Sequence, residues 1–265
     1  MSLLTQKFEQ LAGKKALVPF ITAGHPKPEL TVSAMHALVA NGADVIELGI
    51  PFSDPMADGE VIQLSSESAI AQGVGLNDVL SMVSSFREND TTTPVLLMGY
   101  LNPIECFGYS EFVKQANACG INGVLLVDSP PEESEQLLKL LAEKNMHQIF
   151  LVAPTTTDER IKYIMQSATG FIYYVALKGV TGSADLDSES VNKDVLKLKA
   201  LGELPVAVGF GVKDAASATA VAEQADAVVI GSALVKLLGN CVDEKSVVST
   251  IESFLKPIRI ALNSL

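Results

Sequence analysis

Short runs of apolar residues recur along the whole chain, and polar residues do not alternate with them. Each run has about four to six residues and is rich in β-branched side chains, which is typical of strands buried on both faces. Strands of this kind pair in parallel. The pattern predicts eight strands, at residues 16–21, 45–48, 95–98, 124–127, 149–152, 171–175, 206–208 and 227–230.

Segments with helical spacing separate these runs. Apolar residues between 30 and 38 repeat with a helical period, and the following Asn-Gly pair is a stop signal. Thr156 and Glu159 predict a capping box for a helix that ends at Gly170. Four leucines between residues 137 and 141 predict the apolar face of an acidic helix that begins at Pro131. The chain therefore reads as a repeated strand and helix unit.

Eight such units in about 250 residues fit a closed (β/α)₈ barrel, the TIM barrel, as a single domain over residues 1–265. An open doubly wound sheet is the alternative, but it favours a G-x-G-x-x-G turn after the first strand, which residues 20–25 lack. An extra helix at residues 3–12 would close the bottom of the barrel. Residues 242–265 would supply the last outer helices.

Composition and charge narrow the function classes. The chain is 48% hydrophobic with a net charge of -12, and no cluster of lysine or arginine is present to neutralise nucleic-acid phosphates. The chain has neither a secretory signal nor an apolar run near the roughly 18 residues that cross a membrane. The three widely spaced cysteines read as free thiols. We expect a soluble cytoplasmic protein that binds neither nucleic acid nor membrane.

Glu47 lies inside the second apolar run, among aliphatic residues. A carboxylate there loses its hydration, which is costly unless the group is paired or protonated. One interpretation is a paired structural glutamate. The other is a catalytic acid/base with a raised pKa, which the position on a barrel strand favours.

The loop at residues 51–59 is long and rich in proline, as functional loops often are. Asp54 before Pro55 reads as a turn former. Asp58 before Gly59 is compatible with a turn, with the cap of a helix from Glu60, or with a functional carboxylate.

Glycines gather in the last three predicted loops, at residues 179–183, 209–212 and 231–233. Their backbone N–H groups, with a short helix starting at Ser232, would form the anion site where barrels commonly bind phosphate. No Walker lysine follows any of them, so a nucleoside triphosphate is not indicated. We expect Gly182, Gly211, Gly231 and Ser232 to bind a phosphate group.

The sequence has no motif that indicates metal binding or covalent catalysis. The three histidines, His25, His36 and His147, are far apart, with His36 in the first helix and His147 just before the fifth strand. No G-x-S-x-G elbow and no strand lysine provide a nucleophile. We expect no metal and no cofactor, and an acid/base reaction on a phosphorylated substrate.

Residues 47–59, Glu-Leu-Gly-Ile-Pro-Phe-Ser-Asp-Pro-Met-Ala-Asp-Gly, closely resemble the signature of the tryptophan synthase α subunit family. His25 stands where that family usually has Asp, and Ser129 lies in a Val-Asp-Ser-Pro segment where Pro-Asp-Leu-Pro is more usual. The resemblance covers essentially the whole chain and includes residues 19–24, 97–103, 179–182, 209–211 and 231–233.

The resemblance implies a carbon–carbon lyase of tryptophan biosynthesis that cleaves indole-3-glycerol phosphate to indole and glyceraldehyde 3-phosphate. Glu47 would protonate indole C3 and also take the glycerol hydroxyl proton, while Asp58 would accept a hydrogen bond from the indole N–H. Tyr173 would hold Glu47 and the substrate. In the same reading Phe20, Tyr100 and Phe210 contact the substrate, and Thr181 reaches toward Asp58 when the loop closes.

The resemblance also implies a partner, the pyridoxal-phosphate-dependent β subunit, in an allosteric α2β2 heterotetramer in which indole passes through a tunnel. Residues 52–59 and the region of Asn102 and Pro103 match surfaces that meet this partner. Two rivals remain: another phosphate-binding barrel isomerase, and a non-catalytic phospholigand-binding regulatory subunit. Turnover of indole-3-glycerol phosphate separates them.

Overall fold

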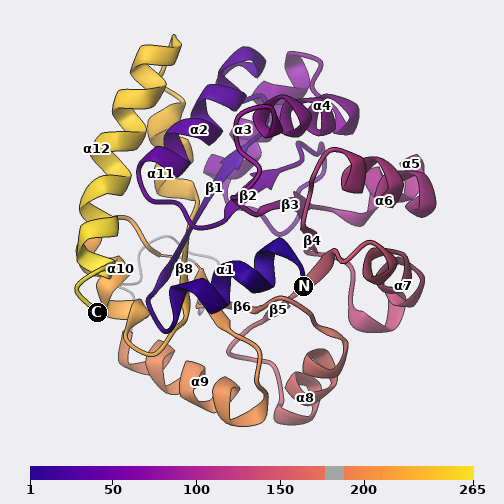
Figure 1. Cartoon of the computed structure of the whole chain (residues 1–265), viewed down its shortest axis with the longest axis vertical. Coiled ribbons are helices and arrows are strands. Elements are labelled where there is room, and N and C mark those ends of the chain that lie inside the picture. Colours follow the sequence, from indigo (N-terminus) through magenta and orange to yellow (C-terminus); the bar gives the residue numbers. More distant parts are fainter. Residues whose placement is uncertain (177–187, 210) are drawn as a thin grey trace.

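The computed structural model describes residues 1–176, 188–209 and 211–265. Within these ranges eight parallel strands follow one another in chain order and close into a barrel, and helices surround it (Figure 1). The (β/α)₈ prediction is confirmed. The strands are β1 (Ala16–Thr22), β2 (Ile46–Gly49), β3 (Val95–Gly99), β4 (Gly123–Leu126), β5 (His147–Val152), β6 (Ile172–Val175), β7 (Val206–Gly209) and β8 (Ala227–Ile230).

The outer layer consists of helices that bury their apolar faces against the strands. Two 3-10 turns, η1 (Pro28–Leu30) and η2 (Pro131–Glu133), precede two of them. The helices are α1 (Leu3–Leu11), α2 (Thr31–Ala40), α3 (Glu60–Ala71), α4 (Leu76–Arg87), α5 (Leu101–Phe107), α6 (Tyr109–Ala118), α7 (Glu135–Glu143), α8 (Asp158–Ser167), α9 (Ser188–Leu201), α10 (Ala215–Ala222), α11 (Ser232–Leu238) and α12 (Glu244–Leu262).

Helix α1 (Leu3–Leu11) lies across the amino-terminal ends of the strands (Figure 1). The Ser2 hydroxyl accepts a hydrogen bond from the Thr5 N–H at 3.1 Å and so caps the helix. Leu4 is fully buried in the cluster that fills the barrel, and the ring of Phe8 lies 5.7 Å from that of Phe171. The predicted extra helix therefore closes the bottom of the barrel.

Alternation along the strands separates an inner from an outer core. Val18, Leu96, Ile149 and Ala207 belong to the inner cluster, whereas their strand neighbours pack outward against the helices. Mostly small and aliphatic side chains, together with Phe171, make up this inner cluster, as is usual for this fold. Polar side chains therefore find room at the carboxyl ends of the strands.

Three boundaries differ from the sequence prediction. Helix α8 is capped by Thr157, whose side chain accepts from the Arg160 N–H at 3.3 Å, so the predicted cap at Thr156 was wrong by one residue. The Thr156 hydroxyl instead accepts from the Ala153 N–H at 3.0 Å and closes the preceding turn. The acidic helix begins after the 3-10 turn η2, and His147 is the first residue of β5 rather than the residue before it.

The carboxy-terminal stretch forms one long helix, α12, rather than several. Its Asp243 cap accepts from the Ser246 N–H at 2.8 Å, which fixes the start, and Pro257 lies within it. Across the described ranges, no helix combines the length and the apolar character needed to cross a membrane.

Candidate active site

Glu47 lies on β2 with its side chain directed into the barrel, between Val45 and Gly49 in the strand alternation. The residue is 1% exposed, and within the described ranges neither carboxyl oxygen has a hydrogen-bond partner. Burial, and then the nearby Asp58 charge, raise the pKa of Glu47 to about 8. A paired structural glutamate does not fit this environment, whereas an acid that keeps its proton at neutral pH does.

Asp58 is half-buried at the mouth of the barrel, and Tyr100 holds it there. The Tyr100 hydroxyl donates to the Asp58 carboxylate and accepts from the Ala57 N–H at 3.0 Å. Burial raises the pKa of Asp58 to about 6, against the lowering effect of the Tyr100 hydrogen bond. Gly59, not Asp58, is the N-cap of α3, so the helix-cap interpretation of Asp58 is wrong.

Tyr173 lies close enough to both carboxyl groups for their charges to act on it. It is 6% exposed on β6, and burial together with the charges of Glu47 and Asp58 raises its pKa well above the ordinary value. A side chain at Gly209 on the neighbouring strand would overlap the Tyr173 hydroxyl. Glycine at this position therefore leaves room for the phenol ring. The structure therefore brings together the three residues expected to be catalytic.

Phe20 and Tyr100 supply apolar surface around this cluster. Phe20 on β1 is in register with Glu47, and a Cβ added to Gly49 would approach its ring to 2.6 Å. On the other side of Phe20, a Cβ at Gly231 would lie 3.6 Å from the Phe20 Cβ. The Tyr100 ring stacks on Phe52 at 5.1 Å between centroids.

The described residues expected to bind phosphate lie at the same edge of the barrel. Gly211 follows β7 with a φ of 75°, a conformation that favours glycine. Gly231 follows β8 and precedes α11, which begins at Ser232 as expected. Thr181, Gly182 and Phe210 lie outside the described residues.

His25, which departs from the family's usual residue, packs against α11. Its ring donates to the backbone carbonyl of Val235, and burial lowers its pKa. Its Nε2 atom would be 3.3 Å from a Cβ at Gly239, just after the helix. Searched over the described residues, the chain has no group of three or more His, Cys, Asp or Glu side chains that could hold a metal ion.

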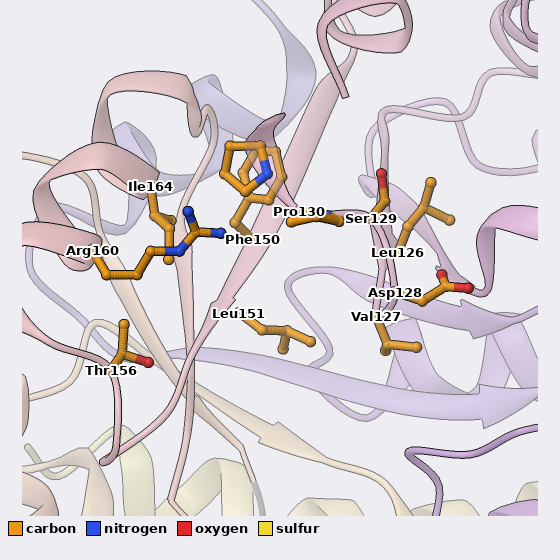
Figure 2. Close-up of a pocket in the computed structure, with 11 residues that line it drawn as sticks. Leu126, Val127, Asp128, Ser129, Pro130, Phe150, Leu151, Thr156, Arg160 and Ile164 are labelled. Atoms are coloured by element: carbon orange, nitrogen blue, oxygen red, sulfur yellow. The ribbon is translucent and has the colours of Figure 1, made fainter. Parts of the chain in front are cut away.

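A pocket of about 280 Å³ opens between the carboxyl ends of β4 and β5 (Figure 2). We call it the wedge pocket. Sequence reasoning missed it, although most of its residues lie in or just after two adjacent predicted strands. Its lining comprises Leu126, Val127, Asp128, Ser129, Pro130, Pro131, Phe150, Leu151, Thr156, Arg160 and Ile164.

Sequence reasoning also missed that Tyr100 pairs with Asp58. The available signal was position: Tyr100 follows β3 directly, so its side chain starts at the edge where the loop after β2 begins.

Comparisons with known proteins extend over almost the whole chain. The model of a family described as "Tryptophan synthase alpha chain" matches residues 7–261. A tryptophan synthase alpha chain from Cupriavidus metallidurans is 56% identical over the full length of both chains, and one from Acinetobacter baumannii is 51% identical over the same extent. The chain belongs to the tryptophan synthase alpha chain family. The resemblance noted in the sequence is confirmed, and with it a lyase function in tryptophan biosynthesis.

Solved tryptophan synthase structures have the same fold. The alpha subunit from Legionella pneumophila is 43% identical and superposes with a TM-score of 0.91, with all of both chains covered. A tryptophan synthase complex from Pyrococcus furiosus contains a chain that is 35% identical, with a TM-score of 0.82, covering 92% of this chain and 98% of that one.

Proposed function

We propose that this chain cleaves indole-3-glycerol phosphate to indole and glyceraldehyde 3-phosphate, with Glu47 and Asp58 as its catalytic carboxyl groups. The observation that carries the proposal is the pairing of a buried, unpartnered Glu47 of pKa about 8 with an Asp58 of pKa about 6. Near pH 7 the first is mostly protonated and the second mostly ionised. When two carboxyl groups have different pKa values, the protonated one can act as the acid and the ionised one can stabilise positive charge.

The reaction begins when Glu47 donates its proton to C3 of the indole ring, which becomes a cationic indolenine. Asp58 accepts a hydrogen bond from the ring N–H and stabilises the positive charge. The bond between C3 and the glycerol side chain then breaks, and its electrons return to the ring. The adjacent hydroxyl loses its proton to the Glu47 carboxylate and becomes the aldehyde, so Glu47 regains the proton it gave.

The substrate is proposed to bind at the carboxyl edge of the barrel, where Glu47 and Asp58 lie. Phe20 and Tyr100 would contact the indole ring and the carbon chain, and Phe210 would join them. The backbone N–H groups at Gly211, Gly231 and Ser232, together with Gly182, would hold the phosphate, because freed N–H groups at strand-to-helix turns favour anions. Tyr173 would keep the Glu47 carboxyl directed at the ring, and Thr181 would approach Asp58.

The proposed partner is a tryptophan synthase β subunit, in an α2β2 complex in the cytoplasm. Support comes from the Pyrococcus furiosus relative, which was solved as a complex. It comes also from apolar side chains at the surface, since Met56 in the loop before α3 is 79% exposed and Leu64 on α3 is 56% exposed. Asn102 and Pro103 on α5 would extend this surface.

The test is the release of indole from indole-3-glycerol phosphate, measured with the purified chain alone and with a β subunit added. We expect slow release by the chain alone and a clear increase with the partner. The Glu47→Gln variant is the control for contaminating activity. Absence of indole in both settings would overturn the proposed function.

A further inference from the structure

Asp128 follows β4 and lies beside the first residue of α5, because β3 and β4 stay paired up to that point. Leu126 is in register with Gly99, and the Val127 N–H donates to the Gly99 carbonyl at 3.1 Å. Leu101 and Asp128 come directly after this last paired stretch. The Asp128 carboxylate accepts a hydrogen bond from the Leu101 N–H at 2.8 Å, so the loop after β4 is joined to the start of α5.

This bond satisfies the first N–H group of α5 from a different loop. Tyr100 occupies the N-cap position with φ −116° and ψ 156°, and its side chain turns to Ala57 and Asp58 instead of capping the helix. A carboxylate is a strong acceptor for N–H groups at the start of a helix. Asp128 therefore fixes the point at which α5 begins, and with it the Tyr100 backbone.

The Asp128 carboxylate is presented to α5 from a fixed backbone. On one side of it, Val127 is hydrogen-bonded to β3. On the other side, the Ser129 and Ser134 hydroxyls are 2.7 Å apart, and the Gln148 side-chain N–H on β5 donates to Ser134 at 3.0 Å. These two serines and the glutamine are at most 3% exposed. Figure 2 shows the carboxyl group of Asp128 pointing away from Phe150, on the far side of the wedge pocket.

Tyr100 carries the position of α5 to Asp58. The Tyr100 hydroxyl accepts from the Ala57 N–H at 3.0 Å and donates to the Asp58 carboxylate. Because the ring is rigid, a shift of the Tyr100 backbone moves the hydroxyl as well. Burial, and further the charges of Asp58 and Asp128, raise the pKa of Tyr100, so the phenol stays protonated and remains a donor.

We propose that Asp128 is a positioning residue for Asp58. Through the Leu101 N–H it sets the start of α5, and α5 in turn sets the Tyr100 hydroxyl that binds the Asp58 carboxylate. The loops after β2, β3 and β4 thus form one relay, of which only the last member touches the substrate. The inference rests on the proposed function, in which Asp58 stabilises the cationic ring.

The test measures the ionisation of Asp58 by titration of its side-chain carboxyl ¹³C resonance, assigned by its loss in Asp58→Asn. In Asp128→Ala the Leu101 N–H loses its acceptor, and the Tyr100 hydrogen bond that lowers the pKa of Asp58 is weakened. The titration midpoint should move up by at least about half a pH unit. The acidic limb of kcat/KM, measured with the β subunit, should move in the same direction, and kcat should fall by at least about fivefold.

Other titratable groups also act near Asp58. Glu47 and Tyr173 feel its charge, so the basic limb of the same profile is recorded to show that the Glu47 ionisation stays in place. A general disturbance of the site would move both limbs. A change confined to Asp128 and Tyr100 should move the acidic limb alone.

Two further variants separate the hydrogen bond from a general loss of structure. Asp128→Asn keeps a side-chain oxygen that can accept from the Leu101 N–H, and it should stay within about twofold of the parent kcat. Asp226→Ala is the matched control, since Asp226 accepts from the Val206 N–H at 2.8 Å, a bond of the same kind at the start of β7. This control should leave the Asp58 midpoint unchanged.

A double-mutant cycle tests the route of the effect. In Tyr100→Phe the hydroxyl is already gone, so adding Asp128→Ala should not move the Asp58 midpoint further. If Asp128 acted on Asp58 by another route, the two movements would add. Full additivity would therefore overturn the proposal, as would an unchanged midpoint in the folded Asp128→Ala variant.

If Asp128→Ala does not fold, Leu101→Pro removes the donor in its place. Proline is favoured at the first position of a helix, and the extended conformation of Tyr100 suits the residue before it. This variant should raise the Asp58 midpoint as Asp128→Ala would, and an unchanged midpoint would refute the relay. Failure of the proposed function is distinguishable, because the ¹³C titration needs no substrate, whereas a parent chain without that function would release no indole.

Discussion

Tyr100 donates a hydrogen bond from its hydroxyl to the carboxylate of Asp58, although the two residues lie in different loops of the barrel. The same hydroxyl accepts from the Ala57 N–H at 3.0 Å, and the Tyr100 ring stacks on Phe52. The residue after β3 therefore holds both ends of the loop that carries Asp58. The position of one proposed catalytic carboxylate therefore depends on a residue that follows a different strand.

Removal of this hydroxyl should change the pH dependence of catalysis. In Tyr100→Phe the ring can still stack on Phe52, but Asp58 loses the hydrogen bond that holds its pKa down to about 6. The acidic limb of the kcat/KM profile, which reports ionisation of Asp58, should move to higher pH. The basic limb, set by Glu47 with its pKa of about 8, should stay in place and serves as the internal reference. An acidic limb that does not move would show that the Tyr100 hydroxyl does not affect the ionisation of Asp58.

Glu47→Gln should fold and lose cleavage by at least about 10²-fold, the usual scale for a general acid, because an amide cannot deliver the proton. Steady-state turnover with the β subunit present measures this loss. Near-normal turnover by the folded variant would remove Glu47 from the mechanism.

The free energy of unfolding of Glu47→Gln tests whether the pKa of Glu47 is raised. The folded pKa of Glu47 is about 8 and the unfolded value about 4.5, so the folded state binds more protons between these values. The Glu47 contribution to the free energy of unfolding is therefore present below about pH 4.5, falls as the pH rises to about 8, and is constant above it. Relative to the parent chain, Glu47→Gln should gain stability from pH 5 to pH 8 in urea titrations. A stability difference that does not change over this range would contradict the burial of an unpaired carboxyl group.

The sequence predicts the barrel well because its signals are local. A strand buried on both faces is a continuous apolar run, and all eight runs lie within two residues of a strand at either end. Glu47 was found for the same reason, since a carboxyl group inside such a run is visible without a structure.

Relationships between distant segments were not visible in the same way. The pairing of Tyr100 with Asp58 depends on where two loops meet, and the wedge pocket depends on where β4 and β5 part. At α8, two adjacent threonines were both possible caps, and the turn at Ala153 takes the hydroxyl of the first. The choice between them is made by backbone geometry that composition does not encode.

The proposed phosphate site can be tested at Gly211. With a φ of 75° it tolerates a side chain poorly, so alanine would strain the backbone that is proposed to bind the phosphate. Gly211→Ala should raise KM for indole-3-glycerol phosphate more than it raises the inhibition constant of an unphosphorylated indole analogue. Gly13→Ala is the control, since Gly13 has a φ of 90° and open surroundings between α1 and β1, at the other end of the barrel. Equal weakening of both ligands in Gly211→Ala would place the phosphate elsewhere.

Asp58→Asn separates a catalytic role from a structural one. Gly59 caps α3, so the substitution should change the free energy of unfolding by less than about 1 kcal/mol, since Asn fills turn and cap positions nearly as well as Asp. Catalysis should nevertheless fall by roughly two orders of magnitude even with the β subunit, because a neutral amide cannot stabilise the cationic indolenine. The chain alone and the complex are compared in kcat and in thermal unfolding. If the partner increases kcat of Asp58→Asn to the parent level, Asp58 acts by ordering the loop that meets the partner, and its charge has no part in the chemistry.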